Sequence, residues 1–201
     1  MYFCYLDVPP PENLLTTEQC LEKLRRDKSF TFEKRSFVEK ELEMPLGLDV
    51  RYCNPDEIFH TDVRKPARRL MWIKSRVRLP NDLLLQQCTI AYASDRILFG
   101  VAFYPHGICG FGSNVKLQTS LDFSIWFHDY MQSARTEQSL TTKHSPTVAD
   151  SGSLQSVDDW FLYQIECPVM KNNRGWVYCH VWNRYGELIA TTQTEGIARL
   201  R

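Results

Sequence analysis

The sequence lacks the cysteine and histidine patterns that build metal sites and disulfide frameworks. Its seven cysteines are odd in number, and no two of them form a C-x-x-C pair. Zinc sites and small disulfide-stapled domains use paired or closely spaced cysteines, so this pattern indicates reduced thiols in an intracellular protein. The five histidines show no ligand spacing either. We therefore expect no bound metal ion.

The sequence also lacks an excess of charge of one sign, and it lacks long apolar runs. Lysine plus arginine and aspartate plus glutamate both number 24, so no global basic field would attract nucleic acid. No apolar run approaches the ~20 residues of a membrane span. The apolar start MYFCYL ends at Asp7, which is too short for a signal peptide. One local basic group is expected to be solvated surface rather than an anion site: Arg64, Lys65, Arg68 and Arg69.

Two regions of different character divide the chain. Residues 1–44 predict a linker and a short helix, because three consecutive prolines favour extended chain and Thr16 and Gln19 have capping-box spacing. Residues 45–201 predict one domain, since 43% hydrophobic and 24% charged residues are typical of a globular protein. Within it, residues 131–158 are polar and rich in serine and threonine, and we predict a flexible insertion.

The domain predicts one long helix and several antiparallel strands. Residues 83–97 are apolar nearly all round and favour a central helix, with Asn81 or Asp82 as its cap. Strands are predicted at residues 47–55 and 68–79 and at LDFSIWFH, and a loop at VAFYPHGICGFGSN. The stretches DWFLYQIECPV, RGWVYCHVWN and ELIATTQTEGIARL predict a meander. This order indicates an α+β fold in which the sheet wraps around the helix.

One carboxylate stands out in the predicted helix. Leu84, Cys88, Ala91 and Asp95 are spaced 4, 3 and 4 apart and share one helical stripe. We expect this stripe to face the core and to carry Asp95 with it. A buried carboxylate is costly unless it has partners. Asp95 is therefore either a hydrogen-bonded interior residue or a functional group.

Five stretches in collinear order carry a family resemblance. They are MWIKSRVRLPNDLLL, QQCTIAYASDRILFGVAFYPHG, SLDFSIWFH, DDWFLYQIE and RGWVYCHVWNRYGELIATTQTEGIAR. Together they resemble the acyl-CoA thioesterase II (TesB-type) family, from about residue 45 to the C-terminus. The resemblance implies a hot-dog fold, an antiparallel sheet wrapped round one long helix. It also implies that the chain holds the linker and the second hot-dog of the family's tandem pair.

The resemblance implies a catalytic site as well. The family's aspartate falls on Asp95 and its serine or threonine on Ser120. The family's glutamine directly precedes the E-G pair of the last strand, where this chain has Thr194, with Gln193 one place earlier. In a regular strand, Thr194 would face Asp95 and Gln193 would face away, because neighbouring side chains alternate. A bulge near Gly196 would instead swing Gln193 inward.

The implied activity is hydrolysis of acyl-CoA to a carboxylic acid and CoA by a water that Asp95 activates, with no metal or organic cofactor. Loss of the orienting amide could reduce the rate ~10²–10³-fold, by analogy with an oxyanion-hole donor. The alternative is therefore a catalytically impaired hot-dog protein that binds acyl chains or acts as an assembly subunit. His106 and His128 are expected to be structural, and Trp126 and Phe127 to lie in the core.

A single hot-dog would expose a sheet edge and an apolar flank, and such edges pair with other chains. We therefore expect a homodimer or a pairing with another hot-dog chain. A truncated form of a longer double hot-dog protein is the remaining alternative. Eukaryotic members of the family often end in a peroxisomal S-K-L signal, whereas this chain ends in ARLR, so we expect a cytoplasmic location. The sequence does not predict the acyl-chain length.

Overall fold

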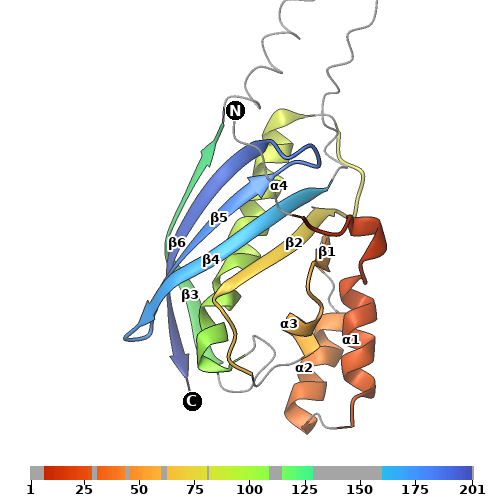
Figure 1. Cartoon of the computed structure of the whole chain (residues 1–201), viewed down its shortest axis with the longest axis vertical. Coiled ribbons are helices and arrows are strands. Elements are labelled where there is room, and N and C mark those ends of the chain that lie inside the picture. Colours follow the sequence, from red (N-terminus) through yellow and green to blue (C-terminus); the bar gives the residue numbers. More distant parts are fainter. Residues whose placement is uncertain are drawn as a thin grey trace, which may run out of the picture.

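The computed structural model describes residues 7–28, 31–43, 46–59, 63–80, 82–108, 115–128 and 160–200. In this part of the chain a six-stranded antiparallel sheet curls around one long helix, which is the predicted hot-dog arrangement (Figure 1). The strand order is β1-β2-β4-β5-β6-β3. The strands are β1 (Leu48–Tyr52), β2 (Arg68–Ser75), β3 (Val115–Phe127), β4 (Phe161–Lys171), β5 (Arg174–Trp182) and β6 (Leu188–Leu200). The predicted insertion at 131–158 lies outside the described residues, as do Cys4, Cys109, His60 and His144.

The central helix α4 (Leu83–Ile97) begins and ends where the sequence predicts. The carboxylate of Asp82 caps its first turn by accepting hydrogen bonds from the backbone N–H groups of Leu84, at 2.8 Å, and Leu85, at 3.4 Å. Ile90, Ala93 and Ser94 are the buried residues of α4 and face the sheet. The helix therefore lies on one face of the sheet, as Figure 1 shows.

The stripe of α4 that contains Asp95 does not face the core, and that prediction is wrong. Leu84 is 56% exposed, and Cys88 and Asp95 are exposed as well. The sheet covers α4 on one side only, whereas the helix carries apolar residues nearly all round. The hydrophobic period therefore cannot tell which apolar stripe is buried. Leu84 and Tyr92 consequently leave apolar surface exposed along the helix.

A 3₁₀ helix, η2 (Leu98–His106), follows α4 directly, where the sequence predicts a loop. Its residues from Leu98 to Tyr104 are buried except Gly100, and they pack against β4 and β5. Burial of this apolar run outweighs the local glycine and proline signals. The helix ends at Gly107, whose φ of 67° places it in the left-handed region that glycine adopts readily.

The predicted meander is present as β4, β5 and β6, joined by two tight turns. Asn172 and Asn173 form the first turn with φ values of 52° and 64°, a conformation that asparagine tolerates and that suits a hairpin. Gly186, with a φ of 80°, lies in the second turn. The meander supplies much of the core, in which Ile165, Val177, Cys179, Val181 and Ala190 are fully buried.

The N-terminal segment also packs on the domain. Three helices lie beside β1 at one side of the sheet (Figure 1): α1 (Thr17–Arg26), α2 (Phe32–Glu43) and α3 (Asp56–Phe59). The capping box of Thr16 and Gln19 is present at the start of α1, as predicted. The second helix, α2, is not predicted by the sequence. It joins α1 around a small cluster of buried residues: Cys20, Leu21, Leu24 and Val38.

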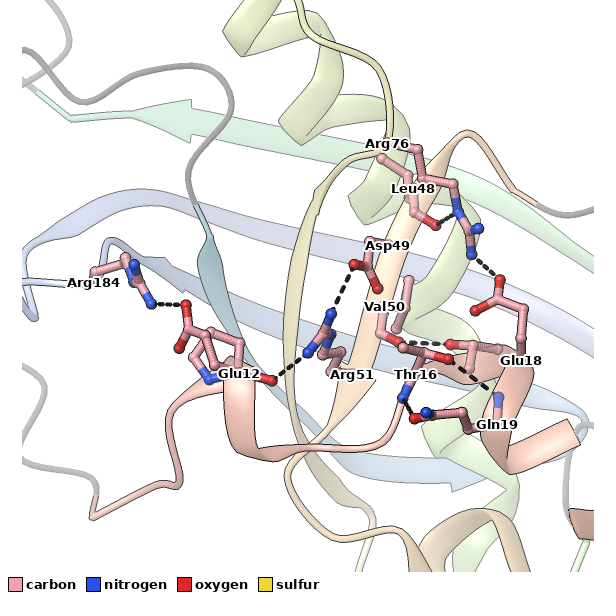
Figure 2. A network of polar contacts seen from close by, with 12 residues as sticks. Glu12, Thr16, Glu18, Gln19, Leu48, Asp49, Val50, Arg51, Arg76 and Arg184 are labelled. Carbon is pink, nitrogen blue, oxygen red and sulfur yellow. Dashed lines mark hydrogen bonds and ion pairs between the residues drawn. The ribbon is translucent and has the colours of Figure 1, made fainter.

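The residues before α1, 8–14, form a strap across the outer face of the sheet and contain the short 3₁₀ helix η1 (Pro11–Asn13). Arg51 of β1 donates a hydrogen bond of 2.7 Å to the carbonyl oxygen of Pro11, and Glu12 pairs with Arg184 (Figure 2). The indole Nε1 of Trp72 donates to the carbonyl oxygen of Pro9 at 2.9 Å. Val8 and Leu14 pack on a buried cluster of Trp72, Trp160, Leu162 and Trp182.

Candidate functional site

Two of the predicted site residues lie in direct contact. Ser120 of β3 donates a hydrogen bond from Oγ to Oδ1 of Asp95 in the last turn of α4, at 3.1 Å. The side chain of Asp95 is exposed, so a small molecule can approach its carboxylate. β3 is an edge strand of the described sheet, and the Asp95–Ser120 pair therefore lies at the margin of the domain.

A bulge in β3 turns Ser120 toward α4. Every second residue of the range 123–127 packs against the core, and continuing this alternation would point Leu121 inward and Ser120 outward. The register of β3 against β6 shifts between Ser120 and Asp122, so Leu121 is an extra residue in β3. Leu121 is accordingly 50% exposed. The extra residue reverses the alternation and brings the hydroxyl of Ser120 within reach of Asp95.

The remaining two predicted residues, Thr194 and Gln193, lie on opposite faces of β6. From Ala190 to Ala198 burial alternates along this strand without interruption, and Thr194 is 2% exposed on the inner face. Gln193 is half-buried on the outer face, opposite Ser124 of β3. The bulge expected near Gly196 is in the partner strand at Leu121, so it does not swing Gln193 inward. Of the two arrangements considered from the sequence, β6 therefore has the regular one, in which Thr194 faces inward and Gln193 faces outward.

The hydroxyl of Thr194 is buried on the inner face of β6 and makes no hydrogen bond within the described chain. The buried hydroxyls of Ser94 in α4 and Thr192 in β6 have polar neighbours, the phenol of Tyr163 and the thiol of Cys179 respectively. A buried hydroxyl without a partner costs about 1–3 kcal/mol, and such groups often bind a ligand or an ordered water. Ser94 directly precedes Asp95, but its small side chain carries no signal in the sequence that separates it from an ordinary helix residue.

Two glycines let η2 approach the sheet next to this site. A Cβ at Gly196 would lie 2.5 Å from Cε2 of Phe99, and a Cβ at Gly175 would lie 3.2 Å from the same atom. Gly175 and Gly196 are direct partners in β5 and β6, and Gly196 also pairs with Ser120. Phe99 comes one helical turn after Asp95. The close packing of Phe99 on bare backbone therefore helps to set the separation of Asp95 and Ser120.

The aromatic residues and histidines around the motif of β3 have structural surroundings. The Nε2 atom of His128 lies 2.9 Å from the hydroxyl of Thr191 in β6. His106 is exposed at the end of η2. Phe127 packs against the core, whereas Trp126 is 49% exposed and does not lie in the core, contrary to the prediction. Adjacent strand residues face opposite sides, so both could not be interior.

The basic group near β2 is only partly solvated surface. Arg64 and Arg68 are exposed, but the side chain of Arg69 is 10% exposed and lies 3.5 Å from the Glu57 carboxylate. Its guanidinium also lies 4.8 Å from the ring centre of Tyr104. Burial raises the pKa of Glu57, although the charge of Arg69 acts in the opposite direction. This pair ties α3 to β2 and lies apart from Asp95.

The described residues offer neither a cluster of metal ligands nor a membrane-spanning helix. Among the residues that the structure describes, no group of three or more histidine, cysteine or acidic residues could hold a metal ion. No helix in the same part of the chain is long and apolar enough to cross a membrane.

Comparison with known sequences finds acyl-CoA thioesterases among the relatives of this chain. The family profile for acyl-CoA thioesterase matches residues 48–152, which is more than half of the chain. Mouse acyl-coenzyme A thioesterase 8 is 28% identical over 200 residues, covering 99% of this chain and 54% of that protein. Acyl-CoA thioesterase 2 of Haemophilus influenzae is 25% identical over 193 residues, covering 96% of this chain and 56% of that protein. The chain thus spans about half the length of the curated relatives it matches.

Solved structures share the fold. The TesB protein of Mycobacterium avium subs paratuberculosis has a TM-score of 0.58 at 21% identity, covering 98% of this chain and 54% of that one. The acyl-CoA thioesterase II TesB2 of Mycobacterium marinum has a TM-score of 0.54 at 23% identity, covering 79% of this chain and 52% of that one. A hot-dog protein of Alicyclobacillus acidocaldarius has a TM-score of 0.58 at 15% identity, covering 99% and 56%. The predicted hot-dog fold is confirmed.

Proposed function

Because this chain belongs to the acyl-CoA thioesterase family, we propose that it hydrolyses acyl-CoA to a carboxylic acid and CoA. The observation that carries the proposal is the 3.1 Å hydrogen bond between Ser120 Oγ and Asp95 Oδ1. Hydrolysis of a thioester needs a base and an orienting group that act on the same water. An exposed carboxylate held by a neighbouring hydroxyl, at the margin of the domain, supplies both.

In the proposed reaction, Asp95 accepts a proton from water while the water oxygen forms a bond to the thioester carbonyl carbon. Collapse of the tetrahedral intermediate then breaks the carbon–sulfur bond. The CoA thiolate leaves and takes the proton from Asp95, which returns the carboxylate to its charged form. The hydroxyl of Ser120 orients the carboxylate and the water. No step in this sequence requires a metal ion or an organic cofactor.

Thr194 is our candidate for the third polar group, and Gln193 has no part in the proposed site. Thr194 shares the inner face of β6 with Gly196, the direct partner of Ser120, and its hydroxyl is buried without a normal hydrogen bond in the described chain. A threonine hydroxyl is shorter than a glutamine amide. We therefore expect turnover below that of relatives with the amide, by up to ~10²–10³-fold.

The same departure at Thr194 supports a second candidate function, a non-catalytic hot-dog protein that binds acyl chains or assembles with another chain. Exposed apolar side chains follow the accessible stripe of α4 and the edge strand: Leu84, Tyr92, Leu117 and Leu121. An apolar flank beside an edge strand is suited to pairing with another sheet. We propose that a second hot-dog, from a copy of this chain or from a related protein, covers this surface in either case.

Thiol release from a panel of acyl-CoAs, short to long, tests the catalytic proposal. We expect turnover by the wild type and its loss in Asp95→Asn. Asp122→Asn is the matched control. It neutralises an exposed carboxylate in β3, two residues after Ser120, and should leave kcat unchanged. A folded wild type that releases no thiol from any acyl-CoA would contradict hydrolysis and favour the binding candidate.

A further inference from the structure

Three basic side chains gather on the outer face of the sheet, away from Asp95. Lys171 and Arg174 are direct partners across the β4–β5 turn, and Arg174 pairs with Ile197 of β6. Arg199 follows Ile197 by two residues and therefore lies on the same face. All three basic side chains are exposed. Figure 1 shows the β4–β5 turn and the C-terminal end of β6 at the same end of the sheet. We call Lys171, Arg174 and Arg199 the cation cluster.

The cation cluster carries a local surplus of positive charge on a chain whose formal net charge is zero. Arg174 pairs with Glu195 at 3.0 Å, with side chains 57% and 42% exposed. Asp122 is the cross-strand partner of Glu195 and adds a second carboxylate. Within the described chain, Lys171 and Arg199 form no ion pair. Two cations therefore remain available to an anionic ligand.

An exposed aromatic ring adjoins the cation cluster. Trp176 lies two residues after Arg174 on the same face of β5 and is 42% exposed. Its ring centre lies 4.8 Å from that of Tyr178, which supports one side of the indole. Exposed tryptophan rings stack on nucleobases, and nearby basic side chains bind the phosphates. The combination of one ring and several cations fits a nucleotide that carries multiple phosphates.

From these observations we propose that the cation cluster and Trp176 bind the adenosine 3′-phosphate 5′-diphosphate end of a CoA thioester. The proposal deepens the proposed thioesterase function and depends on it for the identity of the ligand. Gly175, next to Arg174, lies in one cross-strand row with Gly196 and Ser120, so about 10 Å of sheet separates Ser120 from the cluster. The cluster lies on the outer face and the Asp95–Ser120 pair on the inner face, so the pantetheine arm, which holds the phosphates well away from the thioester, has to pass round the edge strand β3.

Calorimetric titration with CoA and with dephospho-CoA tests the site without any need for turnover. We expect the double variant Lys171→Glu/Arg199→Glu to weaken CoA binding at least ~10-fold, because each change replaces attraction by repulsion. The preference of the wild type for CoA over dephospho-CoA should shrink in the double variant. Lys40→Glu in α2 is the matched control for an exposed lysine and should bind like the wild type. High salt should weaken wild-type binding.

Two results would overturn the proposed nucleotide site. One is equal CoA affinity of the wild type and the double variant when both have the same far-ultraviolet circular dichroism and Tm. The other is an absence of measurable CoA binding by the folded wild type. If the chain is a thioesterase, the double variant should raise KM for acyl-CoA, keep kcat, and hydrolyse acyl-pantetheine like the wild type. Absence of turnover on all substrates, with CoA binding lost only in the double variant, would reject the enzyme and keep the site.

Discussion

The ring of Phe99 lies directly on the backbone of Gly196, where a Cβ would come within 2.5 Å of Cε2. Glycine is needed at this position because the ring occupies the space of a side chain, and not for its conformational freedom, since the φ of Gly196 is not positive. The contact joins the start of η2 to the strand that pairs with Ser120. It therefore couples packing in the core to the geometry of the Asp95–Ser120 pair.

Gly196→Ala should destabilise the protein by about 1–3 kcal/mol, because the new methyl group overlaps a buried aromatic ring. Activity should fall as well, since the displaced ring lies one turn from Asp95. Gly100→Ala is the control, because a Cβ there meets nothing within 4 Å. Urea denaturation measures both variants. Equal stability of the two would show that the ring moves aside without loss.

Asp95→Asn and Ser120→Ala should not act independently on kcat. We expect Asp95→Asn alone to reduce kcat ~10²–10⁴-fold by loss of the base, and Ser120→Ala to reduce it ~10²-fold or more. Because both groups act on one water, the double variant should be close to Asp95→Asn alone. Ser124→Ala, on the outer face of the same strand, should leave kcat unchanged. Multiplicative effects in the double variant would mean that the two residues act separately.

Thr194→Val should separate stability from function. Removal of a buried hydroxyl that lacks a normal hydrogen bond should stabilise the fold by about 1 kcal/mol, while turnover falls because the proposed site loses a polar group. Thr192→Val is the comparison, two residues away on the same face: its hydroxyl interacts with the thiol of Cys179, so this change should not stabilise the fold and should leave turnover unchanged. Thermal denaturation and thiol release measure the two effects. Unchanged turnover in Thr194→Val would remove this residue from the proposed site.

The reactivity of Cys88 should report whether a partner covers α4. Cys88 is exposed, whereas burial raises the pKa of Cys53 to about 12 and also raises the pKa of Cys167. Alkylation of native protein should therefore be fast at Cys88 and slow at these two. The alkylation rate at Cys88 is obtained from the part of the labelling that is lost in Cys88→Ser. This rate should fall as dimers form. An unchanged rate across a transition seen by light scattering would move the interface away from this stripe.

Arg51→Ala should loosen the strap. Its guanidinium donates to Pro11, pairs with Asp49 at 3.3 Å and lies 4.8 Å from the ring centre of Trp160. Loss of a part-buried, charge-assisted hydrogen bond and a cation–π contact should reduce the free energy of unfolding by about 2 kcal/mol. Arg26→Ala, which removes an 80% exposed side chain, should change it by less than about 0.5 kcal/mol. If both variants changed the free energy of unfolding by similar amounts, the strap would be held by apolar packing alone.

Features with a local cause are predictable from this sequence. The cap at Asp82 needs only the residues that follow it, and the turn at Asn172 and Asn173 needs only side chains that tolerate positive φ. Features decided by distant packing are not. The apolar character of α4 extends around the helix, so its period leaves open whether Asp95 is buried or exposed. The single extra residue at Leu121 leaves the alternation of β3 readable on each side but hides where it reverses.

The strap has a consequence for the order in which the molecule folds. Glu12 contacts Arg184 across 172 residues of sequence, and Pro9 contacts Trp72 across 63. Such non-local contacts form late, because the loops that they close are long, whereas the β4–β5 and β5–β6 hairpins close locally. During synthesis residues 8–14 leave the ribosome before β5 does, so they lack their binding surface until β5 has followed. The strap is thus among the last segments of this domain to reach its native position.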